Sequence, residues 1–295
     1  MGYILSPLRG LLKRMNLTDL QLEQKSLAYR QRILRYIYQA GAGHTGGSLS
    51  CTDILNVLYN RVLNVSPETF KADNGRDRFI QSKGHSVEAL FVVLADRGFF
   101  AESELDTLCH YQSHFVGHPT RKVPGVEFNT GALGHGLSIA AGVALAGKMD
   151  DARFRVFTLM GDGELAEGSV WEAAMAAAHH ELDNLVAVVD HNTLQISGRT
   201  RDVCSNEPLD EKFAAFGWTV RKIDGHSIAA LTKAFTDAPD AGKPTVVIAD
   251  TVKGKGISFM EDVAKWHHGV PTAAEFEKAS EELKMALARL GGRQQ

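Results

Sequence analysis

Short continuous apolar runs punctuate the chain and predict the strands of a sheet. The runs at 154–160, 185–190, 218–223 and 245–250 have the length of buried strands, and a shorter candidate lies at 77–80. Stretches with helical periodicity lie between them. Because strand and helix alternate, the chain is expected to form an α/β fold, a mostly parallel sheet with helices on both faces.

Helical periodicity is clearest near the two ends of the chain. The segment 19–40 predicts a long amphipathic helix that ends at Gly41-Ala-Gly43, 52–63 predicts a second helix, and 272–290 predicts a charged amphipathic helix. These patterns divide the chain into an N-terminal arm (1–18), one domain (19–271) and a C-terminal helix and tail (272–295).

Two helical stretches carry signals for their starting residues. Ser169 followed by Glu172 predicts a capping box at the start of an Ala-rich helix that reaches residue 181. The stretch 131–148 is very rich in Gly and Ala, which predicts a tightly packed helix. Its Gly-rich start could receive an anion.

Composition excludes several classes of protein. A hydrophobic content of 44%, a charged content of 23% and a net charge of −3 are ordinary for a globular protein. They give no reason to expect nucleic acid or a membrane surface as a partner. No apolar run is long enough to span a bilayer, and the first 15 residues lack the apolar core of a signal peptide. The three cysteines lack C-x-x-C spacing, so a cytoplasmic location is expected.

Oxygen-bearing side chains follow two of the predicted strands. Asp162, within Gly-Asp-Gly, comes after the run 154–160, and Asn192 comes after the run 185–190. In open α/β sheets, ligands bind at the carboxyl ends of the strands. Mg²⁺ prefers about six oxygens and often shares them with a diphosphate. The pair therefore predicts a magnesium site for a diphosphate-bearing cofactor, and the carbonyl of Leu194 could complete it.

Histidines next to glycine form the second signal. They are His44, His85, His118 and the pair 267–268. Each alone could cap a loop or fill a polar gap. Together, beside a metal–diphosphate site, they suit proton transfers on a polyhydroxylated substrate.

Two glycine-rich segments resemble nucleotide-binding motifs but do not match them. The segment 131–136 lacks the G-x-G-x-x-G spacing, a clear preceding strand and the acidic residue expected downstream. The segment 253–256 lacks the first glycine of a Walker A loop and its spacing.

Seven ordered motifs make the chain resemble the amino-terminal half of transketolase, a thiamine-diphosphate enzyme. The resemblance covers roughly residues 25–270. The motifs lie at 41–47, 82–85, 117–119, 130–134, 161–168, 192–198 and 253–257, the last followed by Trp266-His267.

The resemblance implies a role for each matching residue. Asp162, Asn192 and the Leu194 carbonyl would hold Mg²⁺, or another divalent cation such as Ca²⁺ or Mn²⁺. Candidates for contacts with thiamine diphosphate are Gly163, His85, His267, Gly131, Leu133, Asn192 and, near the substrate or the diphosphate, Lys253. The catalytic candidates are His44, His118 and His267, and Glu167 would lie at a dimer contact.

The resemblance also implies a partner. Full-length transketolases are more than twice as long as this chain and carry a pyrimidine-binding domain with a catalytic glutamate. The chain therefore resembles one half of a split transketolase, inactive alone and assembled as an α2β2 heterotetramer with a C-terminal subunit. It would transfer a two-carbon ketol unit from a ketose, or its phosphate, to an aldose. His135 and His191 depart from the family pattern, which commonly has a glutamine and an acidic residue there.

Two other interpretations stay open on the sequence. One is another thiamine-diphosphate enzyme with the same half, such as a 2-oxo acid dehydrogenase α subunit or a deoxyxylulose-phosphate synthase-like protein. The other is a non-catalytic cofactor-binding or regulatory subunit. The histidine loops and the segment 253–267 favour transketolase.

Overall fold

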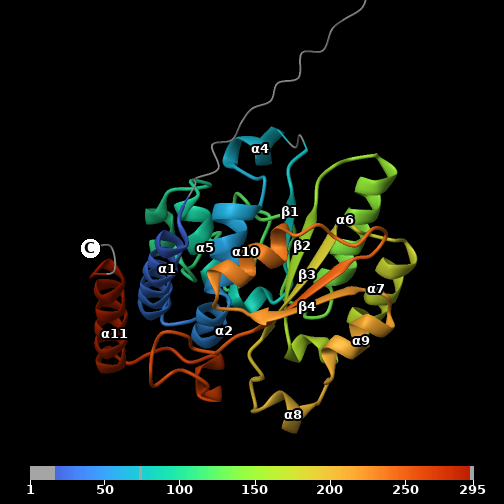
Figure 1. Ribbon diagram of the computed structural model, residues 1–295. Helices are drawn as coiled ribbons and strands as arrows, with labels where there is room; N and C mark the ends of the chain where they lie inside the picture. Colours follow the sequence, from blue (N-terminus) through green and yellow to red (C-terminus); the bar gives the residue numbers. More distant parts are fainter. Residues whose placement is uncertain (1–16, 73–74, 293–295) are drawn as a thin grey trace, which may run out of the picture.

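Five parallel strands form the centre of the molecule. The computed structural model describes residues 17–72 and 75–292. Neighbouring strands follow the order β1-β2-β3-β5-β4, and every pair is parallel (Figure 1). The sheet is therefore wholly parallel where a mostly parallel one is expected. The strands are β1 Arg78–Gln81, β2 Val156–Gly161, β3 Leu185–His191, β4 Thr219–Asp224 and β5 Thr245–Asp250.

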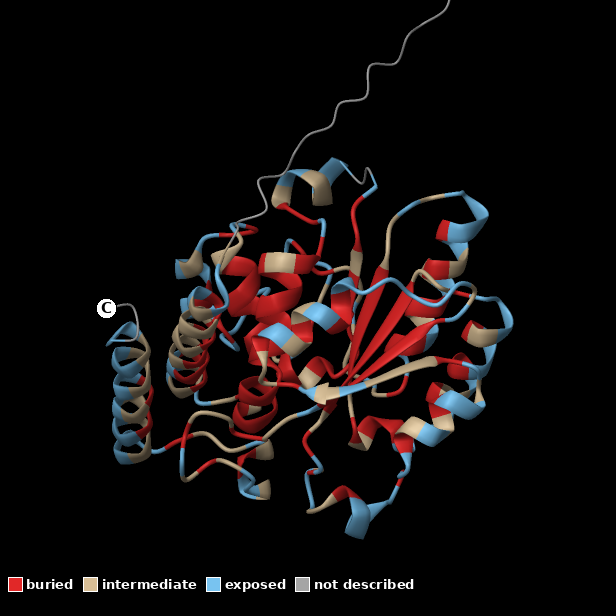
Figure 2. Ribbon diagram, in the orientation of Figure 1, coloured by how far each residue is buried: buried red, intermediate tan, exposed pale blue. Residues whose placement is uncertain are grey.

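Helices cover both faces of this sheet, as the sequence predicts. Side chains alternate between the two faces of a strand, so Phe157 packs in one hydrophobic core and Val156 in the other. Figure 2 shows most of the sheet buried between the two helical layers, whereas the edge strand β4 is intermediate to exposed. The first layer contains α1 Asp19–Ala40, α3 Thr52–Val57, α5 Val87–Asp96 and α10 Ile228–Thr236. The second contains α6 Gly136–Met149, α7 Gly168–His179 and α9 Leu209–Ala215.

The first and last long helices lie side by side (Figure 1). Helix α1 starts with a capping box from Thr18 and ends at Gly41, whose φ of 63° is left-handed. Helix α11, Ala273–Gly291, has a capping box from Thr272. Tyr38 of α1 stacks on Phe276 of α11, with ring centroids 4.3 Å apart. The C-terminal helix therefore packs on the body of the fold.

Three expectations about helix boundaries are wrong in detail. The segment 52–63 is α3 followed by a π-helical turn, Leu58–Val62. Helix α6 begins at Gly136 and not at residue 131, and the N–H of Gly136 donates to Ser82 Oγ at 3.1 Å. Ser169 lies inside α7 and forms no capping box, because its hydroxyl donates to the Gly134 carbonyl at 2.8 Å.

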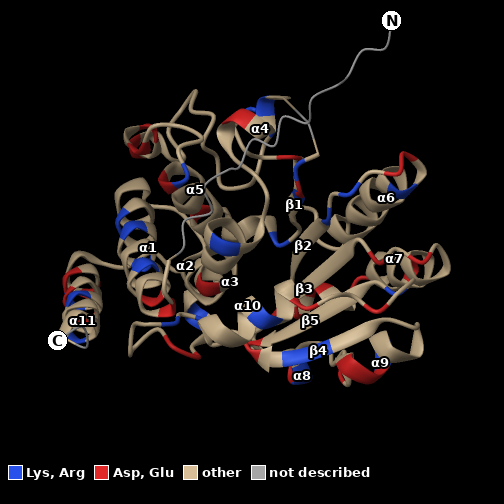
Figure 3. Ribbon diagram, turned by 45° about the horizontal axis from the view of Figure 1, so that its top comes forward, with Lys and Arg blue, Asp and Glu red and all other residues tan. Residues whose placement is uncertain are grey.

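Short elements connect the main ones. They are α2 Thr45–Ser50, α4 Pro67–Ala72, α8 Thr200–Val203 and the 3-10 turns Gly84–Ser86, Glu102–Thr107, Gly163–Ala166 and Ala264–His267. Within the described residues no helix is long and apolar enough to cross a membrane. In Figure 3 the ribbon of α11 carries both acidic and basic residues. Most of the expected N-terminal arm, 1–16, lies outside the described residues.

Candidate cofactor site

The sheet brings the two predicted metal-binding side chains to one edge. Gly161 at the end of β2 is in register with Asp190 of β3, so Asp162 and Asn192 leave neighbouring strands at the same level. Asp162 is buried, and its Oδ2 accepts from Thr193 N at 2.7 Å and Thr200 Oγ1 at 3.1 Å. Burial, reinforced by the charge of Asp190, raises its pKa.

The loop after β3 carries the next two oxygens. Asn192 Oδ1 accepts from Leu194 N at 3.2 Å, and Asn192 Nδ2 donates to Asp190 Oδ2 at 3.2 Å. The Leu194 carbonyl accepts from Lys253 Nζ at 2.7 Å. The same ammonium lies 3.0 Å from His267 Nδ1. The carbonyl oxygen that is predicted to bind the metal thus already accepts a hydrogen bond from a positively charged side chain.

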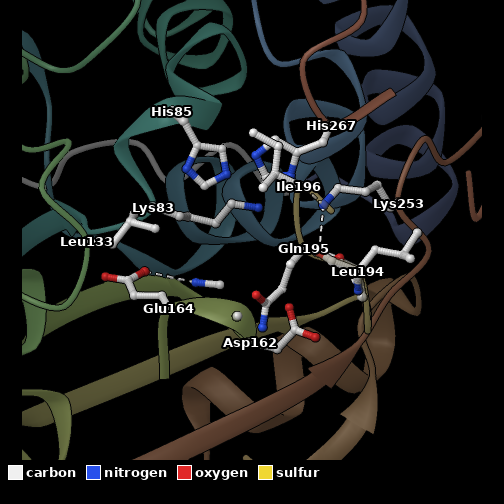
Figure 4. Close-up of a pocket in the computed structure, with 13 residues that line it drawn as sticks. Lys83, His85, Leu133, Asp162, Glu164, Leu194, Gln195, Ile196, Lys253 and His267 are labelled. Carbon is white, nitrogen blue, oxygen red and sulfur yellow. Dashed lines mark hydrogen bonds between the residues drawn. The ribbon is translucent and has the colours of Figure 1, made fainter. Parts of the chain in front are cut away.

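One cavity of about 260 Å³ joins these groups (Figure 4). Eight of the predicted site residues line it: His85, Leu133, Asp162, Gly163, Asn192, Leu194, Lys253 and His267. Five further residues line it without having been predicted: Lys83, Gly161, Glu164, Gln195 and Ile196.

A buried ion pair lies beneath the cavity. The ammonium of Lys83 forms an ion pair with the carboxylate of Asp190, and both side chains are almost wholly buried. Ser50 Oγ donates to the same carboxylate at 2.6 Å, and Lys83 Nζ donates to the Gly47 carbonyl at 3.1 Å. Burial opposes the charge of Lys83, but Asp190 raises its pKa. Nearby, burial and the charge of Lys83 lower the pKa of Lys253 to about 8.

These donors suit a divalent cation shared with a diphosphate. Among the described residues no group of three His, Cys, Asp or Glu side chains could hold a metal. The available set is one carboxylate, one amide oxygen and one carbonyl, which leaves coordination positions for diphosphate oxygens and water. The ammonium on Leu194 shows that this carbonyl can face a positive charge. Lys83 and Lys253 add positive charge for a diphosphate.

Five histidine rings form a cluster around His44, and two of them, His85 and His267, line the cavity. The His44 ring centroid lies 4.5 Å from that of His268, 5.2 Å from His85, 5.7 Å from His267 and 6.3 Å from His118. His85 and His267 stack at 5.2 Å. The four glycine-adjacent loops therefore converge, as the sequence predicts. His268 belongs to the cluster although the resemblance gave it no role.

The pKa values of four of these histidines are lowered. Burial and the neighbouring imidazoles lower the pKa of His44 to about 4, and burial with the charge of Lys253 lowers the pKa of His267 to about 3. Burial and the charge of Lys83 hold the pKa of His85 well below its usual range, and burial also lowers the pKa of His118. Neutral imidazoles near pH 7 can accept a proton.

A buried glutamate supports the His44 loop. Glu88 of α5 accepts from His44 N at 3.2 Å and from Ser48 Oγ at 2.7 Å. Burial raises its pKa to about 7. Sequence reasoning missed Glu88, because nothing in a helix of apolar residues shows which loop it faces.

Glycine allows the loop before α6 to approach a histidine. Gly131 has a φ of +144°, and a Cβ there would lie 2.7 Å from His118 Cδ2. Because glycine has no Cβ, the Gly131 backbone can lie close to the His118 ring. Leu133, two residues on, is the apolar side chain that this loop places in the cavity.

A second buried glutamate ties this loop to β2. Glu164 accepts from Gly134 N at 2.9 Å and from Gly161 N at 3.0 Å, and Ser82 also donates to it. Glu164 lies in the motif at 161–168, but the resemblance gives this residue no role.

The cavity lining does not include the predicted site residues His44, His118, Gly131 and Glu167, nor His135 and His191. Glu167 is exposed at the start of α7. His135 is exposed, and its Nδ1 lies 3.0 Å from the carbonyl oxygen of Leu133. His191 lies between Asp250 and Glu207, with contacts of 2.6 and 2.8 Å. Burial opposes its charge, but the bond to Asp250 and the nearby carboxylates raise its pKa.

Comparison with known proteins shows the family of the chain. Residues 24–288 match the family model described as transketolase, thiamine diphosphate binding domain. The chain is 48% identical over 270 residues to an apulose-4-phosphate transketolase subunit of Phocaeicola vulgatus, covering 91% of this chain and 96% of that one. It is 39% identical over 268 residues to a 6-deoxy-6-sulfo-D-fructose transketolase subunit of a Clostridium species, covering 90% and 97%.

A solved structure agrees with these relatives. The transketolase from Campylobacter jejuni superposes with a TM-score of 0.78 at 29% identity. The match covers 94% of this chain and 48% of that one, so the chain spans about half the length of that enzyme.

Proposed function

Because this chain belongs to the transketolase family through its thiamine diphosphate binding domain, we propose that it is the diphosphate-binding subunit of a transketolase. The enzyme would transfer a two-carbon ketol unit from a ketose, or its phosphate, to an aldose. This proposal rests on the cavity that joins two sets of side chains. Asp162, Asn192 and Leu194 supply oxygens that could coordinate a metal ion, and His85, His267 and Lys253 line the same cavity.

In this proposal each end of the cavity has its own task. The carboxylate of Asp162, the amide oxygen of Asn192 and the carbonyl of Leu194 hold Mg²⁺, or Ca²⁺ or Mn²⁺ in its place. The diphosphate and thiazolium are contacted by Gly163, His85, His267, Lys253, Asn192, Gly131 and Leu133.

Thiamine diphosphate, when bound, supplies the carbon nucleophile that takes up the ketol unit. The chain's own residues handle protons. His44, His118 and His267 accept a proton from a sugar hydroxyl during cleavage and return it during transfer. Their lowered pKa values keep these rings unprotonated at pH 7, which is the form that accepts a proton, and also make them weaker bases than a free imidazole.

We further propose a separate C-terminal subunit that carries the pyrimidine-binding domain, in an α2β2 heterotetramer. Support comes from the two relatives named as transketolase subunits, which this chain matches over 96% and 97% of their lengths. The exposed Glu167 is the proposed contact with the partner region. The substrates are proposed to be sugars or sugar phosphates. A cytoplasmic location fits three free cysteines.

A reconstitution assay tests the split arrangement. The chain, a separately expressed pyrimidine-domain partner and their mixture are each given thiamine diphosphate, Mg²⁺, a ketose phosphate and an aldose phosphate. Only the mixture should form the transferred product, and light scattering should give the mass of an α2β2 assembly. Turnover by the chain alone would refute the split arrangement.

The acceptor used by the mixture separates the rival functions. Aldose-dependent product identifies transketolase, whereas release of CO₂ from a 2-oxo acid identifies the other thiamine-diphosphate enzymes. Product in neither assay, with cofactor still bound, identifies a non-catalytic protein.

A binding experiment tests the metal site. In the assembled protein, Asp162→Ala should weaken Mg²⁺-dependent binding of thiamine diphosphate by about 100-fold or more, since even indirect partners of metal ligands matter by about 10–100-fold. The matched control is Asp106→Ala, which removes an exposed carboxylate outside the cavity lining. Calorimetry that finds equal affinity for the two variants would contradict the assignment.

A further inference from the structure

A buried charged network lies behind the cofactor site and joins three distant segments. Arg30 of α1 donates to both oxygens of Asp53 in α3, at 2.6 and 3.2 Å. Asp53 Oδ2 lies 2.7 Å from His226 Nδ1, in the turn between β4 and α10. The exposed fractions of the three side chains are only 4%, 7% and 14%.

The far nitrogen of His226 fixes the tautomer of the ring. His226 Nε2 lies 2.8 Å from the backbone nitrogen of Val252. A backbone N–H can only donate, so Nε2 must accept and carry no proton. The proton of a neutral ring is then on Nδ1, where it is donated to Asp53. Burial opposes ionisation of Asp53, but Arg30 and His226 hold the pKa of that carboxyl below its usual range.

This geometry differs from that of a catalytic Asp–His pair. In a catalytic pair the outer imidazole nitrogen faces the reacting group and exchanges a proton with it. Here the outer nitrogen is occupied by a main-chain N–H, and His226 does not line the cavity. The pair is therefore arranged to hold a backbone segment in place.

The segment that it holds carries a cofactor-site residue. Val252 directly precedes Lys253. The ammonium of Lys253 donates to the Leu194 carbonyl and lies within hydrogen-bond distance of His267 Nδ1. This segment follows β5 and has no regular secondary structure, so individual hydrogen bonds fix its path. Gly225 makes the approach possible, because a Cβ there would lie 2.5 Å from Thr251 Cγ2.

We propose that His226, oriented by Asp53 and Arg30, is a positioning residue that fixes the Val252–Lys253 backbone. Lys253 is thereby directed onto the Leu194 carbonyl and His267. Its value for cofactor binding rests on the function proposed above, whereas its effect on Lys253 does not.

Two substitutions distinguish the roles of the hydrogen bonds that the two ring nitrogens of His226 make. The amide of His226→Gln can place its oxygen near the position of Nε2 and still accept from Val252 N. The shorter amide of His226→Asn reaches Asp53 but not Val252. Wild type and both variants are measured as the assembled protein.

Nitrogen-15 NMR of the histidine rings provides the readout that needs no cofactor. In wild type, His226 should show a protonated Nδ1 and an unprotonated Nε2. The ring nitrogen shifts of His267 should change in the Asn variant, because Lys253 leaves its Nδ1, and should stay near wild type in the Gln variant. A protonated Nε2 on His226, or identical His267 shifts in all three proteins, would overturn the proposal.

Calorimetry with thiamine diphosphate and Mg²⁺ tests the link to the site. The Asn variant should bind about 10-fold more weakly, and the Gln variant within about threefold of wild type. Equal weakening in both, with equal melting temperatures, would overturn the positioning role at the cofactor site. A wild type that binds no cofactor but shows the expected ring shifts would refute the proposed function and leave the network intact.

Discussion

Two regions differ in how they treat charge: the end of the cavity at Asp162 and Asn192, the proposed metal end, and the cluster of histidines around His44, here called the histidine end. At the metal end, the opposite charges of Lys83 and Asp190 are paired, and Asp162 accepts hydrogen bonds from the chain. At the histidine end, ring centroids lie 4.5 to 6.3 Å from that of His44, and burial with nearby positive charge lowers the pKa values of His44 and His267. In the proposed function, one end holds charge, and the other excludes it until a proton is transferred.

The difference follows from where each end sits in the fold. The metal end lies on strand ends in register, where neighbouring backbones fix the side chains. The histidine end is assembled from loops far apart in sequence, which meet only by packing. We therefore expect substitutions at the metal end to affect stability and cofactor affinity. Substitutions among the histidines should affect turnover and the dependence on pH.

The largest effect is expected at the buried ion pair. Asp190→Ala should destabilise the protein by about 3–5 kcal/mol, because it leaves the ammonium of Lys83 buried without its partner. Urea unfolding measures the loss. Replacing both residues, as in Lys83→Met with Asp190→Leu, should recover part of it. A loss below about 1 kcal/mol for the single variant would show that the pair does not anchor the metal end.

The next effect isolates the histidine end. In the assembled enzyme, His44→Asn should lower kcat by about 100-fold, the lower range for a residue that transfers protons. The Kd of thiamine diphosphate should stay within about threefold, because His44 does not line the cavity. Steady-state kinetics and calorimetry on the same sample separate the two. A large loss of affinity with unchanged kcat would reverse the assignment of the two ends.

A smaller effect is expected in the pH dependence of stability. The pKa values of His44 and His267 fall from 6.5 to about 4 and about 3 on folding. Between pH 7 and 5 the unfolded chain therefore binds protons that the folded rings do not, so stability falls as pH falls. Allowing for solvent screening, about 1 kcal/mol per histidine should be lost over this range.

The histidine contribution is read as a difference between proteins. Glu88, with a raised pKa of about 7, acts with the opposite sign and is common to all variants. The combined His44→Gln and His267→Gln variant should lose less stability than wild type when the pH is lowered from 7 to 5. The exposed His114→Gln variant should follow wild type. Parallel profiles for all three proteins would mean that folding does not lower the pKa values of His44 and His267.

The smallest effect belongs to the loop between the two ends. Ser169→Ala removes one hydrogen bond to the Gly134 carbonyl and should cost about 1 kcal/mol. Thermal unfolding should show this loss without a change in cofactor affinity. If affinity falls more than about threefold, the loop couples the two ends more tightly than its single bond indicates.

Much of the fold could be predicted from local pattern. Helix α1 has the predicted bounds because Thr18 and Gly41 are strong signals at its ends. The predicted start of α7 is wrong for a related reason, since the Ser169 hydroxyl bonds to a distant carbonyl and not to its own helix. Local rules hold where no tertiary partner competes for the same polar group.

The candidate site divides in the same way. Residues in dense glycine motifs, such as Asp162 and His85, could be found from the sequence, and they do share one cavity. Glu88 and His226 could not, although Gly225-His226 is another glycine–histidine pair in the chain. Their roles depend on the backbone groups of His44 and Val252, which lie 44 and 26 positions away.

The sequence by itself determined the parallel α/β architecture, the family and the residues that mark the cofactor site. These follow from apolar periodicity and from short motifs, both of which can be recognised within short continuous stretches of the chain. Only the tertiary structure decided which histidines meet, which carboxylates are paired, and that Lys253 faces the Leu194 carbonyl. The physical reason is that hydrogen bonds and pKa values depend on distance and burial, and packing sets both between segments that no local pattern connects.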